Sequence, residues 1–201
     1  DSYNDIIQLL KDAGATFTIQ HAVAANDIDY VQQWITDGTE KDMNQMNELL
    51  LEASEFGHVG VVERLLEVVG INVNEGDDGT PLYIASENGH TEVVKVLLAA
   101  KDIDVNYGNP LWYASENGHT EVVKALLAAK DINVNQANNQ GKTPLYIASA
   151  YGRTEAVEVL LADKDINVNQ ADRHGDTPLV EATKNNRFGQ HTEVIQLLKD
   201  A

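Results

Sequence analysis

The chain has 201 residues, with 32 acidic residues against 14 lysines and arginines, and a formal net charge of −18 at pH 7. Nucleic-acid binding depends on neutralising phosphates with basic side chains, so this charge argues against a DNA or RNA partner and against anionic membrane surfaces. The chain contains no cysteine, which excludes disulfides and thiol chemistry. No apolar run approaches the roughly 20 residues of a membrane span. We therefore expect a cytoplasmic protein whose partner has a basic or polar surface.

The N-terminal segment DIIQLLKDA (residues 5–13) resembles the closing segment EVIQLLKDA (residues 193–201). The closing segment has the apolar spacing of an amphipathic helix. Residues 1–15 therefore predict one helix of an incomplete repeat, which would cap the N-terminal end of the chain.

Two weaker units follow. The first, at about residues 16–43, has Ala22 at a tight-packing position and Trp34 on its second helix, but it lacks a threonine–proline start. The second, at about residues 44–78, contains the segment LLLEASEFGHVGVVERLL, and Leu49 stands where the later units have proline. Both units predict a pair of helices.

Three strong copies come next, beginning with TPLYIASENGHTEVVKVLLAAKDIDVN at residues 80–106. Residues 109–135 match this segment at 22 of 27 positions, and residues 143–169 match it at 20 of 27. Self-similarity at a period near 33 residues is typical of stacked repeats, because a single unit of this size cannot bury its own apolar face.

Each strong copy predicts two short helices joined by a glycine turn. Thr80 is a good N-cap, and Pro81 suits the first helical position, where its missing N–H costs nothing. Gly89 ends the first helix in the left-handed region, and Thr91 begins the second. The four prolines of the chain share this one place in the repeat: Pro81, Pro110, Pro144 and Pro178.

The pattern TPLYIASENGHTEVVKVLL…IDVN resembles the ankyrin repeat over nearly the whole chain. The resemblance implies an all-α, ankyrin-repeat solenoid of helix-turn-helix units, joined by short or truncated β-hairpin fingers. We expect one domain over residues 1–201. Its repeats would follow the half-repeat cap (1–15) at about residues 16–43, 44–78, 79–107, 108–141, 142–175 and 176–201.

The connections between repeats vary in length. Only three residues separate Asn106 from Pro110, which is too few for a complete hairpin, so we expect a stunted finger there. The last repeat has four extra residues within positions 186–190, a surface insertion at the turn between its helices. Where the family has histidine after TPL, this chain has an aromatic residue, and stacking is expected to replace the histidine-to-threonine hydrogen bond.

Two recurring polar positions are candidates for metal ligands. The histidines after the turn glycine are His58, His90, His119 and His191, and the acidic ladder is Asp102, Asp131 and Asp165. Equivalent residues in packed repeats lie roughly 8–10 Å apart, so they cannot converge on one ion with ligand distances of about 2.1 Å. We predict structural histidines that bridge turns, solvated aspartates and no metal site.

No catalytic pattern is present. The sequence lacks a glycine-rich phosphate loop with lysine, HExxH, G-x-S-x-G and a cysteine nucleophile. We expect a protein that is not an enzyme and binds no cofactor.

The resemblance implies a binding surface on the concave face, formed by the first helices and the finger tips. We predict that the chain is a monomeric, non-catalytic scaffold that binds a protein partner there. The candidate partner-binding residues are Phe56, Glu87, Asn88, Trp112, Glu116, Asn117, Asn139, Gln140, Lys142, Tyr151, Arg173, His174 and Lys184. The alternative is that these positions are solvated helix ends that vary without function.

Two further alternatives stay open. The aromatic run Tyr83, Trp112, Tyr113 and Tyr146 is either a structural ladder beneath the fingers or the wall of a ligand-binding groove. The chain as a whole is either a scaffold or a regulatory or targeting module of a larger enzyme, channel or host-directed effector, and an effector would be delivered into a host cell.

Overall fold

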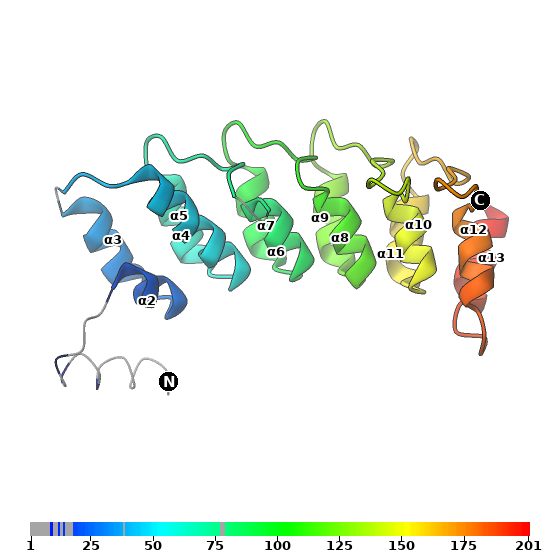
Figure 1. Ribbon diagram of the computed structural model, residues 1–201, viewed down its shortest axis with the longest axis horizontal. Coiled ribbons are helices and arrows are strands. Elements are labelled where there is room, and N and C mark those ends of the chain that lie inside the picture. The colour runs from blue at the N-terminus through cyan, green and yellow to red at the C-terminus, as the bar shows by residue number, and fades with distance from the viewer. Residues whose placement is uncertain (1–8, 10–11, 13, 15–17, 38, 77–78) are drawn as a thin grey trace.

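The computed structural model describes residues 9, 12, 14, 18–37, 39–76 and 79–201, and these residues contain twelve helices and no strand (Figure 1). The helices form six pairs that stand side by side in a row. Their bounds are α2 (Ile19–Ala24), α3 (Ile28–Thr36), α4 (Met43–Glu55), α5 (Val59–Leu66), α6 (Pro81–Glu87), α7 (Thr91–Leu98), α8 (Pro110–Asn117), α9 (Thr120–Leu127), α10 (Pro144–Ala150), α11 (Thr154–Leu161), α12 (Pro178–Asn185) and α13 (Thr192–Asp200).

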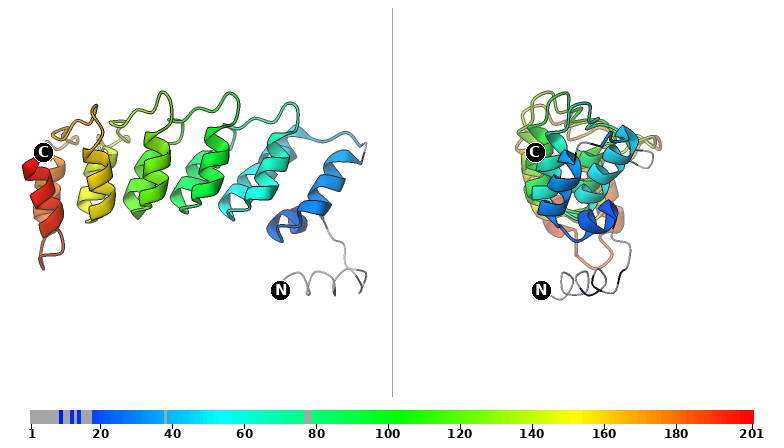
Figure 2. Two further views of the ribbon diagram at one scale, coloured as in Figure 1. Left: turned by 180° about the vertical axis from the view of Figure 1, so that it is seen from behind. Right: turned by 90° about the vertical axis from the view of Figure 1, so that its left-hand side faces the viewer.

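The pairs are arranged in two layers. Each even-numbered helix contacts the even-numbered helices beside it, and each odd-numbered helix contacts its odd-numbered neighbours. The connections between successive pairs lie along one edge of the row, as Figures 1 and 2 show. The predicted all-helical solenoid of helix-turn-helix units is therefore confirmed.

Threonine and proline start the first helices of the strong repeats, as predicted. The Thr80 hydroxyl accepts the Tyr83 N–H at 3.1 Å, which satisfies one of the free donors at the start of α6. Helix α8 starts differently: Asn109 has φ 57° and makes no side-chain cap. The short connection before α8 reverses the chain through this left-handed residue, where the other strong repeats use an extended threonine.

The core lies between repeats. The even-numbered helices pack closely because they place alanine at the contact, where Ala85, Ala114 and Ala148 are fully buried. The odd-numbered helices contribute larger side chains such as Val94 and Leu97, also fully buried. Burying a side chain of this size contributes roughly 1.5–3 kcal/mol, so neighbouring pairs stabilise one another.

The fingers, which were predicted as short or truncated β-hairpins, are hydrogen-bonded turns. The Asn138 N–H donates to the carbonyl of Lys142 at 3.0 Å, and Asp172 pairs in the same way with Asp176 at 2.9 Å. No strand ladder extends from these pairs in the described part of the chain, because the loops close within a few residues. The connection at residues 106–109 is shorter still, as predicted, and leaves Tyr107 57 % exposed.

The ends of the chain are partly described. The predicted cap over residues 1–15 lies largely outside the described residues, as do residues 77–78 in the connection before α6. The first of the two weaker units, at about residues 16–43, does contain a helix pair, α2 and α3. The insertion within residues 186–190 forms turns on the surface and leaves Phe188 87 % exposed.

Candidate protein-interaction surface

A row of outward-facing residues runs along the C-terminal ends of the even-numbered helices. We call it the pre-turn row, the two residues before the turn in five consecutive repeats: Glu55 and Phe56, Glu87 and Asn88, Glu116 and Asn117, Ala150 and Tyr151, Lys184 and Asn185. The side chains of Phe56 and Tyr151 are 47 % and 54 % exposed. Glu87 and Glu116 are half-buried, whereas Asn88 and Asn117 are exposed.

Hydrogen bonds join neighbouring members of this row. The Asn117 amide donates to the carbonyl of Glu87 at 3.1 Å, and the Asn185 amide donates to the carbonyl of Ala150 at 3.0 Å. Each bond connects one repeat to the repeat before it. These two bonds therefore link the predicted helix-end residues of the third and fourth repeats, and those of the fifth and sixth.

The histidines after the turns fix the backbone of the same row. His90 Nε2 lies 2.8 Å from the carbonyl oxygen of Glu55, and His119 Nε2 lies 2.9 Å from that of Glu87. A carbonyl oxygen only accepts, so each Nε2 donates. The corresponding distances are 3.2 Å for His58 to Ala24 and 3.0 Å for His191 to Ala150. These contacts agree with the structural role predicted for the histidines.

Arg153 takes the place of histidine in the fifth repeat, a substitution whose role the sequence pattern did not reveal. Its Nε donates to the carbonyl of Glu116 at 2.8 Å, and its guanidinium lies 5.9 Å from the ring of Tyr151. Arg153 thus makes the same hydrogen bond to the preceding repeat as the histidines do. It also contacts Tyr151, an exposed aromatic residue of the row.

A second ladder joins the loops at the other edge of the stack. The Asn106 amide donates to the carbonyl of Asp131 at 2.9 Å, and its Oδ1 accepts the Asn133 N–H at 2.8 Å. Asn74 and Asn135 make the same pair of bonds to the next repeat, with distances of 2.7–2.8 Å. The recurring loop aspartates thus present their backbone carbonyls to this ladder.

The predicted aromatic run divides into two parts. Tyr83 and Tyr113 meet edge to face with centroids 4.5 Å apart, and Trp112 meets Tyr113 in the same manner at 4.9 Å. Burial, followed by the nearby Glu87 carboxylate, raises the pKa of Tyr83. Tyr146 is not part of this cluster: it is only 2 % exposed, and its hydroxyl donates to Asp172 Oδ2 at 3.2 Å.

The space beside Trp112 is small. It is lined by residues that include Asn109, Gln136 and Pro144 and has a volume of about 10 Å³, room for one water molecule. Ligand pockets usually span about 300–1,000 Å³. This geometry favours the structural ladder over the ligand-binding groove.

The finger residues form a second outward group. Asn139, Gln140, Arg173 and His174 are exposed, and the Arg173 N–H donates to the carbonyl of Gln140 at 3.0 Å. Asp172 anchors the last finger because its Oδ1 accepts the N–H groups of His174 and Asp176 at 2.8 and 3.0 Å.

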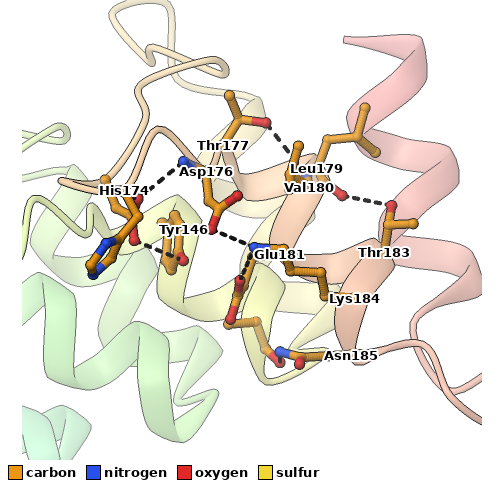
Figure 3. Close-up of polar contacts among 12 residues, drawn as sticks. Tyr146, His174, Asp176, Thr177, Leu179, Val180, Glu181, Thr183, Lys184 and Asn185 are labelled. Carbon is orange, nitrogen blue, oxygen red and sulfur yellow. Dashed lines mark hydrogen bonds and ion pairs between the residues drawn. The ribbon is translucent and has the colours of Figure 1, made fainter.

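Two of the predicted basic contacts interact within the chain. The Lys184 ammonium pairs with Asp176 and lies 3.9 Å from Glu181, as Figure 3 shows. Lys142 lies over the ring of Tyr146, 5.4 Å from its centroid. The charge of Lys184 is therefore paired within the chain, whereas Lys142 contacts an aromatic ring and, among the described residues, keeps its charge unpaired.

The described residues show neither a metal-ligand cluster nor a membrane-spanning helix. Within the described residues, no three histidine or acidic side chains are grouped closely enough to hold a metal ion. No helix in that part of the chain is both long and apolar enough to cross a bilayer.

Comparison with protein families gives one clear result. The family description "Ankyrin repeats (3 copies)" matches residues 19–109 and again residues 111–201. Comparison with curated proteins gave no significant match. The two matched segments cover almost every helix of the stack, including both weak and strong repeats. The chain belongs to the ankyrin-repeat family.

Proposed function

We propose that this protein is a non-catalytic scaffold that binds a protein partner through the pre-turn row. Ankyrin repeats are generally protein–protein interaction modules, and the family match covers nearly the whole chain. The observation that carries the proposal is that bridging hydrogen bonds fix the backbone of the row. The side chains of Phe56, Asn88 and Tyr151 are exposed on that fixed backbone.

Rigid placement favours binding because little conformational entropy is lost when the partner docks. Phe56 and Tyr151 supply exposed aromatic surface at two separate points of the row. Aromatic side chains are common anchors of protein interfaces. The finger residues Asn139 and Arg173 extend the proposed surface beyond the helices.

The proposal is tested by affinity capture from a cell lysate on the immobilised protein. The row variant combines Phe56→Ala and Tyr151→Ala with Glu87→Lys and Glu116→Lys. The matched control combines Glu92→Lys and Glu121→Lys on the second helices with the exposed apolar positions Val69→Ala and Phe188→Ala. Both variants change the net charge equally, and circular dichroism checks that both are folded.

The proposal expects a protein that the wild type and the control variant retain and that the row variant loses. Equal retention by all three forms would place the binding site on the second helices or in the loops. The same would follow if the control variant alone lost the captured protein.

A further inference from the structure

The first helices of three consecutive repeats carry charge of only one sign. Helix α4 contains Glu48, Glu52 and Glu55, α6 contains Glu87 and α8 contains Glu116. These three helices contain no lysine or arginine. The N-terminal half of the first-helix layer therefore presents carboxylates without a cation in the same helices.

The second helices do not supply the missing cations. Lys95 pairs with Glu92 at 2.7 Å and Lys124 pairs with Glu121 at 2.6 Å, each within its own helix. Arg64 lies 3.1 Å from Glu67 in the same way. Arg64, Lys95 and Lys124 are thus already engaged on the other layer of the stack, and the one arginine that reaches α8, Arg153, donates to the backbone carbonyl of Glu116.

The ionised carboxylate of Glu52 lowers the stability of the folded chain. Its side chain is partly buried, and burial, followed by repulsion from Glu55, raises the pKa of the Glu52 carboxyl. His21 of α2 offsets part of that effect. The carboxylates of Glu52 and Glu55 therefore lie close enough to repel each other, and α4 carries no basic residue of its own to offset that repulsion.

Aromatic rings lie among these carboxylates. The Tyr83–Tyr113 pair bridges α6 and α8, with Glu87 close enough to Tyr83 to act on its hydroxyl. Phe56, 47 % exposed, ends α4 in the same row. Lysine and arginine are attracted both to carboxylates and to the faces of aromatic rings, so this combination suits a cationic side chain.

The short connection between α7 and α8 leaves the Tyr83–Tyr113 pair more accessible to a partner. The connection between α7 and α8 lacks the hydrogen-bonded finger that follows α9 and α11, and Tyr107 there is 57 % exposed. Nothing comparable to the turn closed by Asn138 and Lys142 therefore stands beside the Tyr83–Tyr113 pair.

We propose that the acidic–aromatic face, formed by Phe56, Glu87, Glu116, Tyr83 and Tyr113, binds a lysine- and arginine-rich segment of the protein partner. The inference rests on the proposed function and names the chemistry of the partner. Charge complementarity selects this occupant: a second copy of the chain carries the same charge of −18 and is repelled, as is a nucleic acid.

The test uses a fluorescein-labelled synthetic peptide in which lysine and arginine alternate with glycine and serine. Its partner peptide replaces every basic residue with glutamate. Fluorescence anisotropy with the full chain measures the affinity of both peptides at low and at physiological ionic strength. We expect the basic peptide alone to bind, and added salt to weaken its binding.

The decisive comparison uses two isosteric double variants. Glu87→Gln with Glu116→Gln removes two carboxylates from the proposed face, and Glu92→Gln with Glu121→Gln removes two from the second helices. We expect the first pair to weaken peptide binding by about tenfold and the control pair by less than about twofold. Tyr113→Leu, which keeps an apolar side chain, is expected to weaken binding by a further factor of about three.

Equal weakening by the two double variants would overturn the inference, because attraction to net charge would then explain the binding. Failure of the wild type to bind the basic peptide would also overturn it. Neither result bears on the proposed function. The proposed function fails only if the row variant captures the partner as well as the wild type does. A captured partner that depends on the row, and that the basic peptide displaces, supports both.

Discussion

Gly57 lies directly against the ring of His90 in the next repeat. A Cβ added to Gly57 would stand 2.6 Å from Nδ1 of that ring, while Nε2 of the same histidine lies 2.8 Å from the Glu55 carbonyl. Gly89 and His119 repeat the arrangement, with 2.7 and 2.9 Å. The turn glycine therefore serves two needs: it adopts a positive φ, and it leaves room for the bridge that fixes the pre-turn row.

Replacing this glycine tests both needs. Gly89→Ala is expected to lower the free energy of unfolding by about 2–4 kcal/mol, because alanine is strained at φ 77° and its Cβ displaces the His119 ring. Gly175→Ala is the matched control, since Gly175 has φ 85° but no atom within 4 Å of the added Cβ. It should cost only about 1 kcal/mol. Urea unfolding measures both, and equal losses would contradict the role given to the bridge.

The asparagine ladder at the loop edge gives a second prediction. Asn106→Ala removes one donated and one accepted hydrogen bond to the next repeat and should cost about 1–2 kcal/mol in the free energy of unfolding. Asn169 holds the same place in the repeat, but among the described residues its side chain makes no such pair of bonds. Asn169→Ala is therefore expected to change stability by less than about 0.5 kcal/mol. Comparable losses in denaturant unfolding would show that the ladder adds little.

The repeat pattern predicted the helix pairs because its signals are local. Thr80 and Pro81 mark the start of a helix and Gly89 marks its end, so their placement follows from backbone chemistry within a few residues. The bridge between His90 and Glu55 was predicted only in outline, as a contact between turns. Its acceptor is set by the stacking of two repeats, which no single repeat encodes.

Because the Asp172 carboxylate anchors the last finger, we expect the stability of the chain to fall in acid. Burial alone would raise the pKa of the Asp172 carboxyl, but the N–H groups of Asp176 and His174 more than offset it and lower that pKa below its ordinary value of 3.8. Since the folded-state pKa is depressed, this contribution to stability is present above the ordinary value and is lost as pH falls through the folded-state value.

Asp172→Asn should therefore have a lower melting temperature than the wild type at neutral pH. The difference should shrink once the pH falls below about 3.8. Glu158→Gln, an equal change of charge at an exposed position of α11, controls for net charge. A difference between Asp172→Asn and the wild type that persists unchanged in acid would contradict the anchoring role of the carboxylate.

Glu52 predicts the opposite dependence on pH. Its pKa is raised in the folded chain, so the ionised carboxylate costs stability once the pH exceeds the unfolded-state value, and the cost vanishes in acid. Glu52→Gln is therefore expected to raise the melting temperature at neutral pH and leave it unchanged at a pH well below 4.5. Thermal unfolding over this range measures the effect, and a variant less stable than the wild type at neutral pH would contradict it.

The candidate surface was less predictable from the sequence than the fold. Lys184 was predicted to contact the partner, yet it pairs with Asp176, which comes from the preceding finger (Figure 3). Tyr146 was predicted to belong to the aromatic run, yet its hydroxyl donates to Asp172 in the finger that follows α11. Both partners lie in the finger at residues 172–176 and outside the helix that carries the lysine or the tyrosine, so the helix pattern alone does not reveal them.

The central claim is that the partner contacts the first helices, and hydrogen–deuterium exchange of the chain with and without its captured partner tests this most directly. The account predicts slower exchange in α4, α6 and α8, at the turns that follow Phe56 and Asn88, with exchange in α5, α7 and α9 unchanged. Slower exchange confined to the second helices, or to the loops that carry Asn74 and Asn106, would contradict it.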